Sequence, residues 1–179
     1  MSIQLETERL LLRPFEPEDF ESVAAMMAEQ AVADFLTLDK KPQSRAASWR
    51  SFTSMLGHWR IRGFGFFSVF EKSSGAWVGR VGPWQPEDWP SVECGWAITP
   101  AHWGKGYAPE AAIATINWIF AEKPALTRII SLIDPTNANS QAVARKIGEA
   151  KTRETFRIET LTVNIWAAGR SGWLARFGR

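Results

Sequence analysis

The sequence is poor in the residues from which disulfides and metal sites are built. Among 179 residues, Cys94 is the one cysteine, and His58 and His102 are the only histidines. A lone cysteine excludes an intrachain disulfide, so nothing in the sequence requires an oxidising compartment. The two isolated histidines lack metal-ligand spacing, and no histidine motif accompanies Cys94 to activate it as a nucleophile. We therefore expect no metal and interpret Cys94 as an apolar core thiol.

Long hydrophobic runs and an excess of charge of one sign are missing too. No apolar stretch reaches membrane-spanning length, and the beginning of the chain, MSIQLETERLLLR, lacks the basic start and apolar centre of a signal peptide. The formal net charge of +2 gives no strong attraction to nucleic acid or to a membrane surface. The expected protein is cytoplasmic, with neither nucleic acid nor a membrane as a partner.

Length and composition fit one globular domain. The chain is long enough for one full core, and its 45% hydrophobic and 22% charged residues argue against disorder. We place the domain at residues 1–168. The remaining tail, 169–179, mixes Trp173, Leu174 and Phe177 with arginines. This tail could dock on the domain or on the second subunit of a homodimer, or it could fray as a terminus.

Hydrophobic periodicity predicts a mixed order of strands and helices. Strands are expected at 9–13, 64–71, 76–84, 92–99, 126–133, 149–157 and 160–168. Helices are expected at 17–29, 43–60, 107–122 and from the turn at 134–137 to Gly148, whereas 29–42 is irregular and fits a loop or a short helix. The strand, helix and strand between 92 and 133 require one parallel pair, and the other connections suit antiparallel pairing. The expected class is therefore α+β with a mixed sheet.

The stretch from Trp103 to Ala108, Trp-Gly-Lys-Gly-Tyr-Ala, is the most informative local pattern, because a run of helix formers follows it at once. Gly104 and Gly106 allow a backbone turn that brings several N–H groups together, which makes a nest for an anion. The first N–H groups of the following helix add unpaired donors and partial positive charge. The pattern predicts a diphosphate-binding turn; taken alone, it also fits an ordinary turn before a helix.

Three segments together resemble the GNAT superfamily of acyl-CoA-dependent N-acetyltransferases. They are VECGWAITPAHWGKGYAPEA from Val92 to Ala111, DPTNANSQAVARKIG from Asp134 to Gly148 and ETERLLLRP from Glu6 to Pro14, and they span most of the chain. The resemblance is greatest to the ribosomal-protein N-acetyltransferase-like branch. Trp103 departs from the superfamily's usual Gln or Arg at the first position of the loop, a change that this branch often has.

The resemblance implies a single-domain GNAT-like fold, in which a mostly antiparallel sheet flanked by helices is splayed at the cofactor site. The cosubstrate would be acetyl-CoA (coenzyme A), with its pantetheine arm between the strand that ends near Thr99 and the strand that begins near Leu126. A main-chain N–H of Ala97, Ile98 or Thr99 would bond the thioester oxygen. The expected cofactor-binding residues are Ala97, Ile98, Thr99, Trp103, Gly104, Lys105, Gly106, Tyr107, Ala108, Asn137, Ser140 and Lys146.

Glu93 is the candidate general base. It lies on the strand that enters the cofactor loop, beside the apolar residues Val92, Cys94 and Trp96. Desolvation there would raise the pKa of its carboxyl and fit it to accept a proton from an amine, directly or through a water. A structural or merely solvated glutamate is the alternative interpretation.

Ser140 is the candidate acid, and with Asn137 it forms the Asn-x-x-Ser pattern of the family's second motif. Asn137 would cap a helix or bond the pantetheine, and Ser140 could return a proton to the cofactor sulfur. Family members that use a tyrosine acid usually carry it in this region. Here the sole tyrosine is Tyr107 in the phosphate loop, so the identity of the acid is left open.

The predicted function is acetyl transfer from acetyl-CoA to a primary amine by direct attack in a ternary complex. The amine could belong to a protein N-terminus or to a small molecule. Four of the ten tryptophans, Trp84, Trp89, Trp96 and Trp103, would line the acceptor side. A non-catalytic acyl-CoA-binding sensor and an interaction domain on the same fold are the alternatives, the latter suggested by the tryptophans and the amphipathic tail.

Overall fold

A single mixed sheet runs through the computed structural model, which describes residues 3–178. In this range eight strands follow the order β1-β2-β3-β4-β5-β6-β8-β7. They are β1 (Leu5–Glu6), β2 (Leu10–Pro14), β3 (Phe67–Glu71), β4 (Trp77–Trp84), β5 (Glu93–Ile98), β6 (Arg128–Ile133), β7 (Ala150–Ile158) and β8 (Leu161–Gly169). All neighbours are antiparallel except β5 and β6, which confirms the predicted α+β class.

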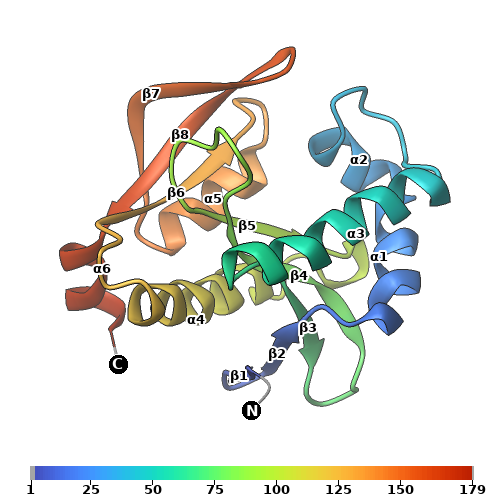
Figure 1. The fold of residues 1–179 in the computed structure, drawn as a ribbon, viewed down its shortest axis with the longest axis horizontal. Helices are drawn as coiled ribbons and strands as arrows, with labels where there is room; N and C mark the ends of the chain where they lie inside the picture. The colour runs from blue at the N-terminus through green and yellow to red at the C-terminus, as the bar shows by residue number, and fades with distance from the viewer. Residues whose placement is uncertain (1–2, 179) are drawn as a thin grey trace.

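The helices cover both faces of this sheet (Figure 1). They are α1 (Phe20–Met27), α2 (Gln30–Leu36), α3 (Arg45–Arg62), α4 (Tyr107–Glu122), α5 (Ala138–Lys146) and α6 (Arg170–Phe177), with short 3-10 turns at η1 (Pro17–Asp19) and η2 (Pro100–His102). The structure contains every strand and helix that periodicity predicted, with shifted ends. The strand predicted at 64–71, for example, begins only at Phe67. The segment 29–42 contains α2, and β1 was missed because two residues are too few to show a period.

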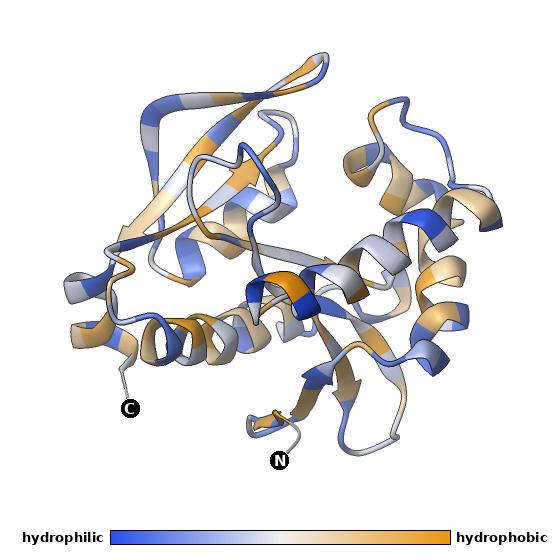
Figure 2. Ribbon diagram, in the orientation of Figure 1, coloured by the Kyte–Doolittle hydropathy of each residue, from blue (hydrophilic) through white to orange (hydrophobic). Residues whose placement is uncertain are grey.

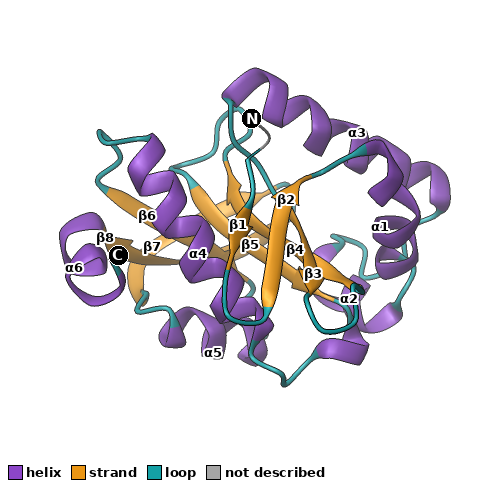
Figure 3. Cartoon of the chain, turned by 90° about the horizontal axis from the view of Figure 1, so that it is seen from below, coloured by secondary structure: helices purple, strands orange, loops and turns teal. Residues whose placement is uncertain are grey.

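The sheet separates two apolar cores, and Figure 3 shows the helices that pack on the sheet. On one face α4 packs against β4 and β5, and on the other face α1 and α3 pack together. The alternation of a strand explains how one segment serves both cores: Phe66 belongs to the α1–α3 core and Phe67 to the α4 core. Hydrophobic residues accordingly colour the central strands and much of α1 and α4, whereas the outer strand β7 is largely hydrophilic (Figure 2).

The two parallel strands touch at one end only. Within the described residues, β5 and β6 are in register at Glu93 and Ile130 alone, where the Ile130 N–H donates to the Val92 carbonyl at 3.1 Å. Beyond that point β5 keeps its pairing with β4 as far as Ile98, while β6 pairs with β8 instead. The sheet is therefore splayed between β5 and β6, as the family resemblance implied.

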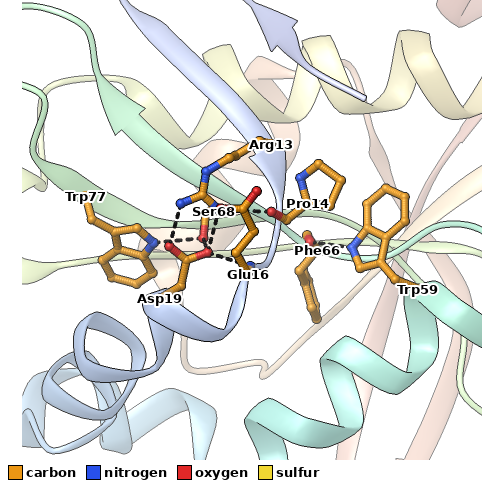
Figure 4. A network of polar contacts seen from close by, with 8 residues as sticks. All are labelled: Arg13, Pro14, Glu16, Asp19, Trp59, Phe66, Ser68 and Trp77. Atoms are coloured by element: carbon orange, nitrogen blue, oxygen red, sulfur yellow. Dashed lines mark hydrogen bonds and ion pairs between the residues drawn. The ribbon is translucent and has the colours of Figure 1, made fainter. Parts of the chain in front are cut away.

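A buried polar network fixes the N-terminal helices to the sheet (Figure 4). Asp19, 4% exposed, accepts a bidentate pair from Arg13 at 2.7 and 2.8 Å and a hydrogen bond from Ser68 at 2.8 Å. The indole N–H of Trp77 in turn donates to the Ser68 hydroxyl at 3.0 Å. Because a buried carboxylate is stable only when it is paired and hydrogen-bonded, this network determines where η1 and α1 begin.

The C-terminal segment forms a helix that docks on the same domain. Trp173 of α6 is 2% exposed within the α4 core, and its indole N–H donates to Asn117 Oδ1 at 2.9 Å. The Asn117 amide donates in turn to the Phe177 carbonyl at 2.8 Å. Of the three possibilities for residues 169–179, the structure shows docking on the domain for the part up to residue 178, and a frayed tail is wrong for that part.

Candidate functional site

Two glycines in left-handed conformation shape the loop before α4. Gly104 has φ of 77° and Gly106 has φ of 80°, a region that side chains other than glycine rarely adopt. Gly106 precedes the first residue of α4, so the unpaired N–H groups of that helix point out of the loop. This geometry is compatible with the anion nest that the sequence predicted, which stays a prediction.

An ion-pair clamp that the sequence did not reveal holds the loop against the N-terminal segment. Glu110, in the first turn of α4, pairs with Arg9 at 2.5 Å and accepts hydrogen bonds from the Arg9 N–H at 3.0 Å and the Thr7 hydroxyl at 2.5 Å. Arg9 also donates to the Lys105 carbonyl at 2.9 Å. The Thr-Glu-Arg segment at residues 7–9 therefore buttresses the loop from outside.

The loop borders a first cavity of about 440 Å³, which continues into the gap between β5 and α5. Ten of the predicted cofactor-binding residues line it: Ala97, Ile98, Trp103, Gly104, Gly106, Tyr107, Ala108, Asn137, Ser140 and Lys146. Thr99 and Lys105 do not, because Thr99 turns toward His102 and Lys105 extends toward Glu71. One continuous cavity thus joins the nest to the splay of the sheet.

Of the three main-chain N–H groups proposed for the thioester oxygen, the structure leaves one that faces the splay. The Thr99 N–H donates to the Val78 carbonyl of β4 at 2.9 Å, so the expectation for Thr99 is wrong. Alternate residues of a strand direct their N–H groups to the same neighbour, and Ala97, paired with Arg80, therefore also faces β4. The Ile98 N–H points to the opposite side, into the gap.

The start of α5 forms the other wall of this gap. The Asn137 side chain caps the helix by accepting the Ser140 N–H at 2.9 Å, which confirms the capping interpretation. The Trp96 indole N–H donates to the Ser140 hydroxyl oxygen across the gap at 3.3 Å. Since that oxygen is the acceptor and the Ser140 hydroxyl has no acceptor among residues 3–178, its own hydrogen is free to reach a ligand.

A second cavity, of about 320 Å³, opens on the α1–α3 face of the sheet. Of the four tryptophans predicted to line the acceptor side, Trp84, Trp89 and Trp96 line this cavity, whereas Trp103 lines only the first one. The two cavities share five lining residues: Phe35, Leu36, Trp96, Asn137 and Ser140. They therefore meet at the splay, with α2 along both.

Glu93 lies in the wall of the second cavity. Burial raises the pKa of its carboxyl to about 7, against the opposing effects of the Trp89 indole N–H at 2.7 Å, the Leu132 main-chain N–H and the positive charge of Arg80. The side chain is half-buried, so it contacts the cavity while protein surrounds the rest of it. A carboxyl with this pKa can exchange a proton near neutral pH.

A second buried carboxyl, Glu149, was not predicted from the sequence. It is 4% exposed, and its Oε1 lies 3.1 Å from the Ser131 hydroxyl, which also donates to the Cys94 carbonyl at 2.9 Å. Burial and the nearby charge of Glu93 raise the pKa of Glu149 to about 8, although the bond to Ser131 acts in the opposite direction. Position 149 follows a helix stop at Gly148 and carries no local signal of burial.

The other titratable candidates are structural. Cys94 is 1% exposed, and burial raises its pKa well above the ordinary thiol value, which leaves it uncharged. His58 Nδ1 bonds the Phe64 carbonyl at 2.7 Å and its Nε2 accepts the Gln85 N–H at 3.2 Å. The Tyr107 hydroxyl donates to the Glu71 carboxylate, which raises the Tyr107 pKa and directs the ring toward β3.

Neither a membrane-spanning helix nor a metal cluster is found in the described part of the chain. No helix within residues 3–178 is both long and apolar enough to cross a bilayer. In the same range, no three His, Cys, Asp or Glu side chains are placed to hold a metal ion.

Comparison with known proteins gives a consistent result. A family model described as the acetyltransferase (GNAT) domain matches residues 9–149. The uncharacterised protein YkkB of Bacillus subtilis is 30% identical over 154 residues, which cover 81% of this chain and 84% of that protein. The crystal structure of an acetyltransferase from Agrobacterium tumefaciens superimposes with a TM-score of 0.80 at 31% identity, over 94% of this chain and 95% of that one. RimL, a ribosomal L7/L12 α-N-protein acetyltransferase solved in complex with coenzyme A, shares the fold with a TM-score of 0.74 at 14% identity, over 93% and 98% of the two chains.

Proposed function

Because this chain belongs to the GNAT acetyltransferase family, whose members take the acetyl group from acetyl-CoA, we propose that it acetylates a primary amine by direct attack in a ternary complex. The amine is that of a small molecule or a protein N-terminus. The observation that supports this proposal is the meeting of two cavities at the splay between β5 and β6. One cavity begins at an anion nest and the other contains a carboxyl with a pKa of about 7.

The first cavity fits coenzyme A in its chemistry. The N–H groups of the Gly104–Ala108 loop would hold the diphosphate, and Lys146, which lines the same cavity, adds positive charge. The Ile98 N–H, directed into the gap, would bond the thioester oxygen and strengthen that bond as the oxygen becomes negative. Acetyl-CoA supplies an acyl group activated as a thioester.

Glu93 would prepare the acceptor in the second cavity. A lysine-type amine has a reference pKa near 10.4 and is mostly protonated at neutral pH, so it must lose a proton before it can attack. The Glu93 carboxylate would take that proton directly or through a water. The amine nitrogen then forms its bond to the acyl carbon, and the bond from that carbon to sulfur breaks.

Ser140 would serve the leaving group. Its hydroxyl oxygen is held by the Trp96 indole N–H and its hydrogen is uncommitted, so the hydroxyl can donate toward the sulfur as the thiolate departs. Counted from the ammonium, the nitrogen would lose two protons: Glu93 passes the first to solvent, and the second, released once the C–N bond has formed, replaces the proton that Ser140 gives to the thiolate. The products are an amide, free coenzyme A and one proton.

Release of free thiol from acetyl-CoA tests this proposal against a panel of peptides, polyamines and aminoglycosides. We expect release that saturates with at least one acceptor. Calorimetric binding of coenzyme A with no release on any acceptor would identify a silent acyl-CoA-binding protein instead. Absence of both would identify an interaction domain on the same fold.

A further inference from the structure

Arg80 lines the second cavity and has neither an ion-pair nor a hydrogen-bond partner among residues 3–178. It lies on β4, and its guanidinium carbon sits 4.0 Å from the centre of the Phe66 ring. Within residues 3–178 the guanidinium makes no ion pair and no hydrogen bond, and its Nε is buried without any partner. By contrast, Arg9, Arg13 and Arg128 each contact a carboxylate. Arg80 therefore differs from these arginines: its Nε is buried, yet no carboxylate compensates its charge.

The pKa of the Arg80 guanidinium lies below its ordinary value, because burial acts on it and no ion pair offsets the effect. Burial lowers the pKa of Arg80 to about 10, and attraction to Glu93 opposes that shift only in part. Glu93 Oε2 accepts the Trp89 indole N–H, and Glu93 acts on Arg80 through longer-range charge attraction alone. A guanidinium has five N–H donors in a fixed fork that matches a carboxylate, and Arg80 is half-buried, with its Nε fully enclosed. The cavity thus offers an anion site that the protein itself does not fill.

The register of β4 and β5 places this site beside the reaction centre. Arg80 pairs with Ala97, the neighbour of Ile98, and faces the same side of the sheet as Glu93. Four residues, or about 13 Å of strand, separate the Arg80 and Glu93 positions along this face. The pair between them is Gly82 and Gly95, and the Phe66 ring, on which the Arg80 guanidinium lies, packs against Gly95. Arg80 and Glu93 nevertheless line the same cavity, so one small molecule can place an anion on Arg80 and an amine near Glu93.

We propose that Arg80 determines the acceptor class: the enzyme acetylates small molecules that carry a carboxylate as well as the primary amine, such as amino acids. This inference rests on the acetyl transfer proposed above. The Arg80 fork binds the carboxylate by charge-assisted hydrogen bonds, and the aromatic residues Phe66 and Trp84 form the wall against which the rest of the acceptor packs. A protein N-terminus lacks a carboxylate at this distance unless a side chain supplies one.

Matched acceptors test the proposal. Thiol release is measured with L-amino acids and with their carboxamides, which keep the amine and lose the carboxylate, in the wild type and in Arg80→Gln. We expect kcat/KM for the acids to fall by about 10- to 100-fold in the variant, while the value for the carboxamides changes less than about threefold. Comparing the two proteins on each acceptor cancels the difference in amine pKa between acid and carboxamide.

Two control variants sharpen the result. Arg80→Lys keeps the charge without the planar fork, so it should recover part of the activity on acids. Arg50→Gln removes an exposed arginine from α3 and should leave both acceptor series unchanged. Because Arg80→Gln removes an unpaired buried cation, its melting temperature should equal or exceed that of the wild type.

Failure of this inference is distinguishable from failure of the acetyl transfer. Equal losses on acids and carboxamides, or a wild type that uses carboxamides as well as acids, overturn the role of Arg80 while the transfer stands. If no acceptor yields thiol, calorimetric titration of the coenzyme A-loaded protein with the amino acids still tests whether Arg80 binds their carboxylate. Binding lost in Arg80→Gln supports the anion site, and binding that is absent or unchanged overturns it.

Discussion

The Ser131 hydroxyl oxygen lies 3.1 Å from Glu149 Oε1, deep beneath the point where β5 and β6 part. A hydroxyl has one hydrogen, and this one also faces the Cys94 carbonyl at 2.9 Å. While Glu149 is charged, the Ser131 hydrogen is shared between the carboxylate and the Cys94 carbonyl; once Glu149 is protonated, its own O–H can donate to Ser131, and the Ser131 hydrogen then goes to Cys94 alone. A neutral carboxyl on the turn before β7 thus links β6 to β5 through side chains where their main-chain pairing ends.

Glu149→Gln should flatten the dependence of stability on pH. The pKa of Glu149 is about 8 in the folded protein and about 4.3 in an unfolded chain, so the folded state holds the proton more tightly. The stability from this group is full below the unfolded value and is lost as the pH rises to about 8. Glutamine keeps the donor and cannot ionise, so the variant should exceed the wild type by about 1–3 kcal/mol at pH 8.

Denaturant unfolding at pH 5 and pH 8 measures this difference. At pH 5, less than one unit above the unfolded pKa, the difference should shrink to about 1 kcal/mol or less. Glu8→Gln, at an exposed position, should behave as the wild type at both pH values. A variant that is less stable than the wild type at pH 8 would show that Glu149 is ionised and differently paired.

Gly106→Val should abolish coenzyme A binding. The left-handed φ of 80° at Gly106 is unfavourable for a β-branched residue, and forcing the backbone into another region turns the loop N–H groups away from the ligand. Calorimetric titration should show no saturable binding while far-UV circular dichroism remains native. Gly57→Val in α3, where a Cβ meets open space, is the control and should bind normally. Unchanged affinity in a folded Gly106→Val protein would contradict the assignment of the loop.

The Arg9–Glu110 clamp makes a separate prediction. Glu110→Gln keeps shape but loses the ion pair to Arg9, so the loop loses its outer support without losing any ligand contact. Arg9 is 45% exposed, and we therefore expect only about 1 kcal/mol of lost stability, with coenzyme A affinity lowered by about three- to tenfold. Glu122→Gln, at the exposed opposite end of α4, should change neither quantity. An unaltered affinity in Glu110→Gln would limit the clamp to a role in stability.

Local chemistry explains which parts of the site the sequence could predict. The loop was predictable because Gly104 and Gly106 act through their own backbone, and the Asn137 cap because its partner is three residues away. The role of Arg80 could not be predicted, because its position in the cavity depends on the register of β4 with β5 and on the packing of Phe66. Glu149 was missed for the same reason: its partner Ser131 lies on β6, across a helix in sequence.

The fold shows the same division between local and distant determinants. Periodicity placed the long strands and helices, because each buries a face of its own. It could not place α6, whose burial depends on Asn117 of α4 accepting the Trp173 indole N–H. Nor could it choose among Ala97, Ile98 and Thr99 for the thioester contact, because the direction of an N–H follows from strand pairing.

Glu93→Gln should lower kcat by about 10²- to 10⁴-fold while cofactor affinity stays nearly intact. Glutamine keeps the shape and can still accept from the Trp89 indole, but it cannot take a proton. The pKa of Glu93 is about 7, so the wild-type base is charged above that pH and protonated below it. Wild-type kcat should therefore fall as the pH drops through about 7, and this limb should be absent in the variant.

The pH profile also separates a base from a structural glutamate. At high pH, solvent has already deprotonated more of the acceptor, so the deficit of Glu93→Gln should shrink there. A structural role would instead lower thermal stability and activity together at every pH. Glu87→Gln, in the exposed loop before β5, provides the matched control and should keep the wild-type profile. If Glu93→Gln retains wild-type kcat across the pH range, the amine proton goes to water or to another residue. The proposed binding of acetyl-CoA would then stand, but the role of Glu93 as the base would not.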